Sequence, residues 1–155
     1  MSSDGYTNHH KDRHTVRAAV FVLLVKEGKT FLIRRQNTGW ADGMFTVPSG
    51  HIEKGETVLE AAQKEAREEA GVIIQPEDLE FLHVHYVGDV YVNFYFKATV
   101  WENEPYCAEP ALCSEVQWVS LEAIPEDTIF HIKHMLSQVG EGIYFSGVVN
   151  DPNPS

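Results

Sequence analysis

One helical segment with recognisable signals at both ends limits the possible folds of this sequence most. Residues 57–60 read Thr-Val-Leu-Glu and match a capping box, in which threonine and glutamate side chains satisfy free amides of a helix's first turn. Gly71 stands where a left-handed residue ends many helices, so the sequence predicts a helix over 58–70. The face expected to pack on a sheet spans roughly 80° of a helical wheel and contains Leu59, Ala62, Ala66 and Ala70.

Short apolar or alternating segments on both sides of this helix predict strands. Residues 16–25 are almost continuously apolar, which is typical of a strand buried on both faces, and residues 30–35 follow as the second arm of a hairpin. Further strands are predicted over 81–87, 90–101 and 115–119, and a second helix over 128–139. Alternation within 90–101 indicates one buried face and one partly open face. Since strands and helices do not alternate regularly, we expect an α/β (α+β) fold with a mixed β-sheet between helices.

Length and charge restrict the domain organisation and the partners. The 155 residues suit a single domain, which we expect over 15–149, with a flexible lead-in over 1–14 and a flexible tail over 150–155. The net charge of −11 argues against binding a nucleic-acid polymer. No apolar run approaches the ~20 residues that span a membrane. Cys107 and Cys113 form no disulfide framework, so we expect a reduced, cytoplasmic environment.

The predicted helix carries more acidic residues than its own stability favours. Glu65 and Glu69 form a like-charge pair one turn apart, and Glu68 lies on the same side. All three stand in the last two turns, where the helix dipole disfavours carboxylates. Such a conflict often marks a functional site, and a hard divalent cation would relieve it. The alternative is a solvated acidic face that Lys64 and Arg67 partly neutralise.

The segment Gly50–Val72, GHIEKGETVLEAAQKEAREEAGV, resembles the Nudix box, G-x5-E-x7-R-E-U-x-E-E-x-G-U, where U is a bulky apolar residue. Gly50, Glu56, Glu65, the Glu68–Glu69 pair and Gly71 occupy its glycine and glutamate positions. Lys64 replaces the arginine of the motif, and Ala66 is smaller than usual. The flanking strands extend the resemblance over about 16–139.

The resemblance implies hydrolysis of a nucleoside diphosphate linked to a group X, by water attack on phosphorus with divalent metal. Mg²⁺ is the expected ion, with Mn²⁺ as an alternative, held by Glu65, Glu68, Glu69 and the Gly50 carbonyl. The same three glutamates are the catalytic candidates together with Glu115, and the general base is either Glu65 or Glu115. Glu56 and Lys64 are implied to brace the loop, less firmly than an arginine would because lysine lacks the planar fork.

Aromatic and amide side chains outside the box are candidates for contact with a small nucleotide substrate: Trp40, Phe45, Trp118 and Asn93, with Tyr91 on the same strand face as Asn93. The alternative for the aromatic residues is a place in the core. The histidine pairs His83/His85 and His131/His134 are not assigned as metal ligands, and His9 and His10 are assigned to a solvated tail. The chain is expected to be a monomer or a homodimer.

Several functions remain open on this fold. The leading hypothesis is a MutT-like hydrolase that converts a nucleoside triphosphate to the monophosphate and pyrophosphate. ADP-ribose, another nucleotide sugar or a dinucleoside polyphosphate are alternative substrates, although the proline that often follows the box in ADP-ribose-cleaving relatives is absent near Val87. Isopentenyl diphosphate isomerases need a cysteine before the box, and both cysteines here follow it. A non-catalytic nucleotide sensor is the remaining alternative.

Overall fold

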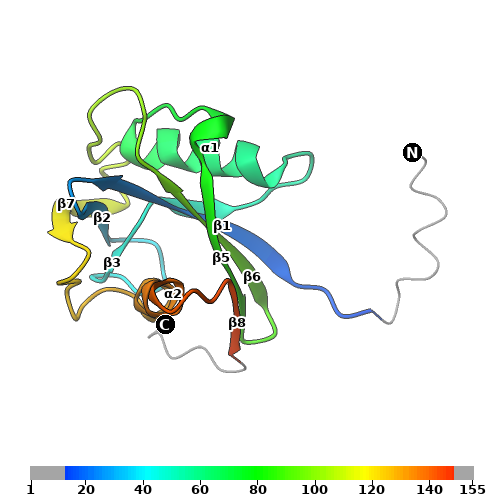
Figure 1. Ribbon diagram of the computed structural model, residues 1–155. Coiled ribbons are helices and arrows are strands. Elements are labelled where there is room, and N and C mark those ends of the chain that lie inside the picture. Colours follow the sequence, from blue (N-terminus) through cyan, green and yellow to red (C-terminus); the bar gives the residue numbers. More distant parts are fainter. Residues whose placement is uncertain (1–12, 149–155) are drawn as a thin grey trace.

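A mixed sheet lies between two helices in the computed structural model, which describes residues 13–148 (Figure 1). The helices are α1 (Val58–Ala70) and α2 (Phe130–Gly140), and a short 3-10 helix covers Pro76–Asp78. The strands are β1 (Arg17–Lys26), β2 (Lys29–Arg35), β3 (Phe45–Thr46), β4 (Ser49–His51), β5 (Glu80–Val87), β6 (Tyr91–Ala98), β7 (Cys113–Ser120) and β8 (Phe145–Val148). The expected mixed sheet with helices is confirmed.

Strand β1 is the centre of the sheet. The sheet order is β3-β2-β1-β6-β5-β8, with β4 also paired to β1 and β7 to β2. The pairs β1–β6 and β5–β8 are parallel, and the other pairs are antiparallel. Ala19 of β1 therefore lies between His51 of β4 and Asn93 of β6, and this row contributes to a cavity described below.

Alternating residues of β1 supply two separate cores. Val20, Val22 and Leu24 pack with the alanines of α1, while Ala19, Phe21 and Leu23 pack with Ile132 and Met135 of α2. Figure 1 shows the two helices on opposite faces of the sheet. Both faces of β1 are buried because a helix covers each one, which confirms the prediction for this strand.

Both ends of α1 agree with the sequence signals. The Thr57 hydroxyl accepts a hydrogen bond from the Glu60 amide at 3.1 Å, and Gly71 ends the helix with φ of 71°. Helix α1 therefore begins and ends at the predicted residues. Its packing face differs from the prediction, since Leu59 is exposed and Ala61 and Glu65 are buried.

The prediction for β6 is wrong in two respects. The strand ends at Ala98 rather than at residue 101. The middle of the face expected to be partly open is buried, because Asn93 is 3% exposed and Tyr95 is fully enclosed beside α2, while Tyr91 and Lys97 at its two ends are half-buried. Polar or hydroxyl-bearing side chains on this face made it resemble a solvated one, yet α2 and the loops cover it. Strands β3, β4 and β8 were not predicted.

The chain ends lie mostly outside the described residues. His9, His10 and the tail over 150–155 fall in the ranges 1–12 and 149–155, which the structure does not describe. Within the predicted lead-in, His14 contacts the Asp89 carbonyl at 2.8 Å. No helix within residues 13–148 has the length and apolar character needed to cross a membrane.

Candidate active site

A cavity of about 430 Å³ opens on the α2 face of the sheet. Its floor includes Ala19 and Phe21 of β1, Asn93 of β6 and residues 49–51 of β4. Its walls come from the loop after β2, the loop before β7 and helix α2, which contribute Trp40, Glu109 and His131. A cavity of this size, mostly apolar with a few polar groups, is typical of a small-molecule site.

Glu69 brings the box helix to this cavity. Helix α1 lies on the opposite face of the sheet, but Glu69 lines the cavity beside β4, where the Ser49 amide donates a hydrogen bond to Oε2 at 3.1 Å. Burial raises the pKa of Glu69 to about 8, against the lowering effect of the Ser49 hydrogen bond. The charges of Glu65 and Glu109 raise it further. The fold thus places Glu69 where its charge is disfavoured.

Glu65 lies one turn earlier, packed against Gly50 of β4, the first glycine of the box. A Cβ added to Gly50 would stand 2.1 Å from the carboxyl carbon of Glu65, so a side chain there would force the Glu65 carboxylate to move. Burial raises the pKa of Glu65 to about 7, and the charge of Glu68 adds to this, while Lys64 acts in the opposite direction. Glu68 itself is exposed on the surface of α1.

These carboxylates suit a cation, although they do not form a finished metal site. Within residues 13–148, no group of three or more His, Cys, Asp or Glu side chains is arranged so that it could hold a metal ion. The predicted convergence of Glu65, Glu68 and Glu69 is therefore not confirmed. The buried Glu65 and the half-buried Glu69, both with raised pKa values, nevertheless form an oxygen-donor set that a hard divalent cation would stabilise.

The loop before α1 is held by the pair that the motif implied. Lys64 Nζ lies 3.0 Å and 2.9 Å from the two carboxylate oxygens of Glu56. Glu56 also accepts a hydrogen bond from the Glu53 amide at 2.8 Å. These contacts lower the pKa of Glu56, the Glu53 hydrogen bond most strongly. Lysine thus makes the loop contact with a single nitrogen.

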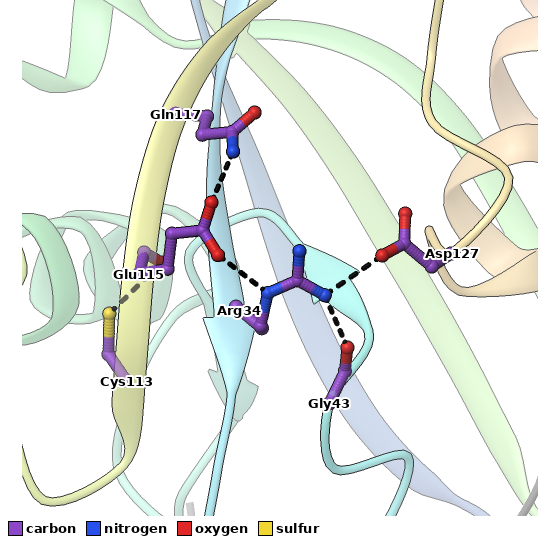
Figure 2. A network of polar contacts seen from close by, with 6 residues as sticks. All are labelled: Arg34, Gly43, Cys113, Glu115, Gln117 and Asp127. Carbon is purple, nitrogen blue, oxygen red and sulfur yellow. Dashed lines mark hydrogen bonds and ion pairs between the residues drawn. The ribbon is translucent and has the colours of Figure 1, made fainter.

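Glu115 belongs to a different network from the box carboxylates. It accepts a hydrogen bond from Arg34 Nε at 2.8 Å and contacts Gln117, while Arg34 also binds Asp127 at 2.9 Å and the Gly43 carbonyl at 2.7 Å (Figure 2). The Arg34 hydrogen bond lowers the pKa of Glu115. Glu115 is absent from the residues that line the cavity. Glu115, one of the two predicted alternatives for the general base, is therefore an ion-paired carboxylate outside the cavity.

Two of the four predicted substrate contacts line the cavity, and two do not. Trp40 and Asn93 line it, as does Tyr91, which hydrogen-bonds His51 at 3.0 Å. Phe45 is 2% exposed and packs under Arg34, so its prediction as a substrate contact is wrong. Trp118 packs between Phe31 and Trp101 in the α1 core and is likewise not part of the cavity. For these two aromatics the core alternative holds.

Glu109 is a cavity residue that sequence reasoning missed. It stands in the loop before β7 and lines the cavity, and its charge raises the pKa of both Glu65 and Glu69. The Ala108 amide next to it donates to the Glu69 carbonyl at 3.2 Å, which holds the loop on the end of α1. The only sequence signal was an acidic residue between two cysteines in a proline-containing loop, and spacing alone does not place such a loop.

Comparisons with known proteins agree with the box. The family model described as NUDIX domain matches residues 13–138. Human 8-oxo-dGDP phosphatase NUDT18 is 35% identical over 86 residues, which are 56% of this chain and 26% of that protein. Phosphatase NudJ of Escherichia coli strain K12 is 32% identical over 103 residues, 63% of this chain and 64% of that protein. The chain therefore spans less than two thirds of either relative.

Solved structures share the fold. The MutT NUDIX hydrolase from Burkholderia pseudomallei superimposes with a TM-score of 0.73 and 25% sequence identity, covering 81% of this chain and 98% of that one. The family model extends over most of the chain and includes the whole segment Gly50–Val72. From the box, the sheet and these matches together, this chain belongs to the Nudix hydrolase family.

Proposed function

We propose that this chain is a Mg²⁺-dependent pyrophosphohydrolase that acts on a nucleoside diphosphate linked to X, with a nucleoside triphosphate as the leading substrate and the monophosphate and pyrophosphate as products. Mn²⁺ is the alternative ion. One observation carries the proposal: the half-buried Glu69, with Glu65 one turn away, lines a cavity that also has aromatic and amide groups in its lining. The acidic side chains that suit a cation therefore lie next to a pocket that suits a nucleotide.

Some residues of the site would hold the cation, and others would accept a proton from the attacking water. Glu65, Glu68, Glu69 and the Gly50 carbonyl would hold the cation. When bound, the cation neutralises diphosphate oxygens and lowers the pKa of a water molecule. As water attacks phosphorus, a P–O bond to water forms, the bond to the leaving pyrophosphate breaks, and a carboxylate accepts the water's proton. Glu65 and Glu109 are the candidates for this base, because both lie near Glu69, whereas Glu115 is paired with Arg34.

The cavity supports a nucleoside as the bound half of the substrate. Trp40 and Tyr91 offer aromatic rings, and Asn93 offers an amide that can both donate and accept hydrogen bonds to a base edge. The human relative is named for 8-oxo-dGDP, which adds a nucleoside diphosphate to the substrates worth testing. ADP-ribose, nucleotide sugars and dinucleoside polyphosphates share the same reacting group and are the alternatives.

A panel hydrolysis assay tests the proposal. Purified protein is incubated with triphosphates, oxidised tri- and diphosphates, ADP-ribose and dinucleoside polyphosphates, with Mg²⁺ or with a chelator. We expect chelator-sensitive product release from at least one class, and the ratio of pyrophosphate to phosphate identifies the bond that is cleaved. No release above blank from any member would reject the hydrolase function. Nucleotide binding without product release would instead support a non-catalytic nucleotide sensor.

A further inference from the structure

The two cysteines of the chain stand on either side of a tight loop, and both are free thiols. Cys107 precedes the loop, and Cys113 begins β7. Between them the chain turns back, because the Leu112 amide donates a hydrogen bond to the Glu109 carbonyl at 2.9 Å. The Cys107 thiol donates to the Cys113 carbonyl at 3.3 Å. A hydrogen bond between the two side chains also adds to the burial that raises the pKa of Cys113 to about 12. The fold thus brings the two thiols together.

The two arms of this loop are attached to different elements. Before the turn, the Ala108 amide donates to the Glu69 carbonyl at the end of α1, at 3.2 Å. After the turn, the Leu112 carbonyl accepts a hydrogen bond at 3.0 Å from the amide of Gln36, which follows β2. Glu109 and Leu112, which lie between these attachments, line the cavity. A covalent bond between the thiols would therefore join the two arms and restrict this part of the cavity wall.

The two thiols differ in access and in backbone surroundings. Cys107 is half-buried, whereas Cys113 is 6% exposed and its thiol donates to the Glu115 carbonyl at 3.4 Å (Figure 2). A small oxidant from solvent therefore meets Cys107 first. Cys113 lies opposite Arg35 at a register shift that leaves Ser114 over. Because the ladder is already disrupted at such a bulge, Cys113 can adjust towards disulfide geometry without breaking a continuous row of strand hydrogen bonds.

We propose that Cys107 and Cys113 are a peroxide-sensitive thiol pair, which closes to an intramolecular disulfide and fixes the loop that carries Glu109. The Cys107 thiolate attacks one oxygen of hydrogen peroxide, the O–O bond breaks, and a sulfenic acid forms while the released hydroxide takes up the thiol's proton. The Cys113 thiol then attacks the sulfenic sulfur, the S–O bond breaks, and a second water leaves. The thiols lose two electrons and two protons, and peroxide is reduced to two water molecules. This inference is independent of the proposed hydrolysis.

The test oxidises the folded full-length chain. Protein is reduced with dithiothreitol, freed of the reductant and treated with hydrogen peroxide, and free thiols and peptide masses are measured. We expect both free thiols to disappear with the loss of two hydrogen atoms, one peptide linkage between Cys107 and Cys113, and full recovery of the thiols with dithiothreitol. Hydrogen exchange of the Leu112 amide, which donates across the turn, should slow about 10-fold or more in the oxidised form, since the disulfide restricts the open states of the loop.

Two variants separate the thiols. Cys107→Ser keeps a donor for the Cys113 carbonyl but cannot form the disulfide, so peroxide should leave its remaining thiol free and its Leu112 exchange unchanged. Cys113→Ser should stop at the sulfenic acid of Cys107, which dimedone captures. Thermal unfolding checks that each variant is folded, and Cys113→Ala replaces a Cys113→Ser that is not.

Four results would overturn the inference. In the wild type these are two thiols that survive peroxide, oxidation of Cys107 to the sulfinic acid beside a free Cys113, and a disulfide that joins two chains. The fourth is an intramolecular disulfide that leaves the exchange of the Leu112 amide unchanged, which would show that the bond does not restrict the loop. The thiol count in the wild type needs no variant, so this result stands even where a cysteine substitution prevents folding.

Discussion

Glu65 and Glu69 lie one helical turn apart on α1, and both are placed where an ionised carboxylate is unfavourable. Their pKa values are raised mainly by burial, and each is raised further by neighbouring carboxylates. Glu56, on the same side of the box, has a lowered pKa because the Glu53 amide and Lys64 bind it. Lys64 thus neutralises the charge of Glu56, whereas Glu65 and Glu69 lack a full counter-charge.

The first prediction concerns the stability of the metal-free protein. When the pKa of a carboxyl group is higher in the folded state than in the unfolded state, the folded protein becomes less stable as the pH rises between the two values. For Glu69 this range runs from about pH 4.5 to about pH 8. Glu69→Gln removes that charge and should raise the free energy of unfolding at pH 8 by about 1–3 kcal/mol, or several degrees in Tm. Thermal unfolding in EDTA at pH 5 and pH 8 measures it. Equal Tm differences at both pH values would show that the Glu69 charge is not destabilising.

A second prediction follows from the contact between Gly50 and Glu65. Gly50→Ala would bring a methyl group to 2.1 Å from the Glu65 carboxyl carbon, so the buried side chain must move. We expect a loss of about 1–3 kcal/mol, as for overpacked sites. Gly140→Ala is the control, since a Cβ there has no atom within 4 Å. Denaturant unfolding compares the two variants, and similar small changes in both would contradict the contact.

Individual residues also show which parts of the candidate site could be predicted from the sequence. The positions of Glu65, Glu69 and Gly50 follow from one motif whose members lie within about twenty residues of each other, so local spacing was sufficient. Glu109 and Arg35 reach the same cavity from a distant loop and from a bulged strand, and no local pattern marks them. The sequence analysis named Glu115 as a candidate base and passed over Glu109, whereas the structure places Glu109 in the cavity lining and pairs Glu115 with Arg34 outside it.

Among the elements, the segment that leads into α1 depends on one ion pair with a lysine. A lysine binds Glu56 through one nitrogen, whereas an arginine would present two in a plane. Lys64→Arg should therefore stabilise the 52–57 segment, and Lys64→Ala should loosen it. Hydrogen exchange of the Glu53 amide, which donates to Glu56, reports this directly. We expect slower exchange in Lys64→Arg and faster exchange in Lys64→Ala; the same rate in all three proteins would contradict a bracing role.

Elements with a strong local signal were predictable, and those that depend on distant partners were not. Helix α1 has capping residues at both ends, and β1 has a continuous apolar run, so both were predicted correctly. Strands β4 and β8 have three and four residues and exist because β1 and β5 offer free edges. Asn93 and Tyr95 of β6 are buried because α2 covers their face of the strand. The alternation of residues within the strand cannot indicate this cover.

Across the whole molecule, the two faces of the sheet have different roles. The α1 face holds an alanine-rich core beneath the box, and the α2 face holds the cavity together with a group of buried histidines. His83 of β5 and His134 of α2 both hydrogen-bond the Ser146 hydroxyl of β8, at 2.7 Å and 3.0 Å. These contacts join three elements behind the cavity wall that His131 supplies.

This arrangement predicts acid sensitivity on the α2 face. Burial lowers the pKa of His83 and of His134, so the unfolded chain takes up protons first as the pH falls below about 6.5. Stability present at neutral pH is therefore lost towards pH 5. His134→Gln should lose fewer degrees of Tm between pH 7 and pH 5 than the wild type. The carboxylates titrate alike in both proteins, so an equal loss would rule out the His134 contribution.

The most direct test of the active site is the rate of hydrolysis of the best panel substrate by wild type, Glu69→Gln and the exposed control Glu122→Gln, each with Mg²⁺ and with EDTA. We expect the wild type and Glu122→Gln to turn over only with Mg²⁺. Glu69→Gln should lose about 100-fold or more, since a cation site supplies several kcal/mol to the transition state. Full activity of Glu69→Gln, or undiminished wild-type activity in EDTA, would contradict a cation held by Glu69 beside the cavity.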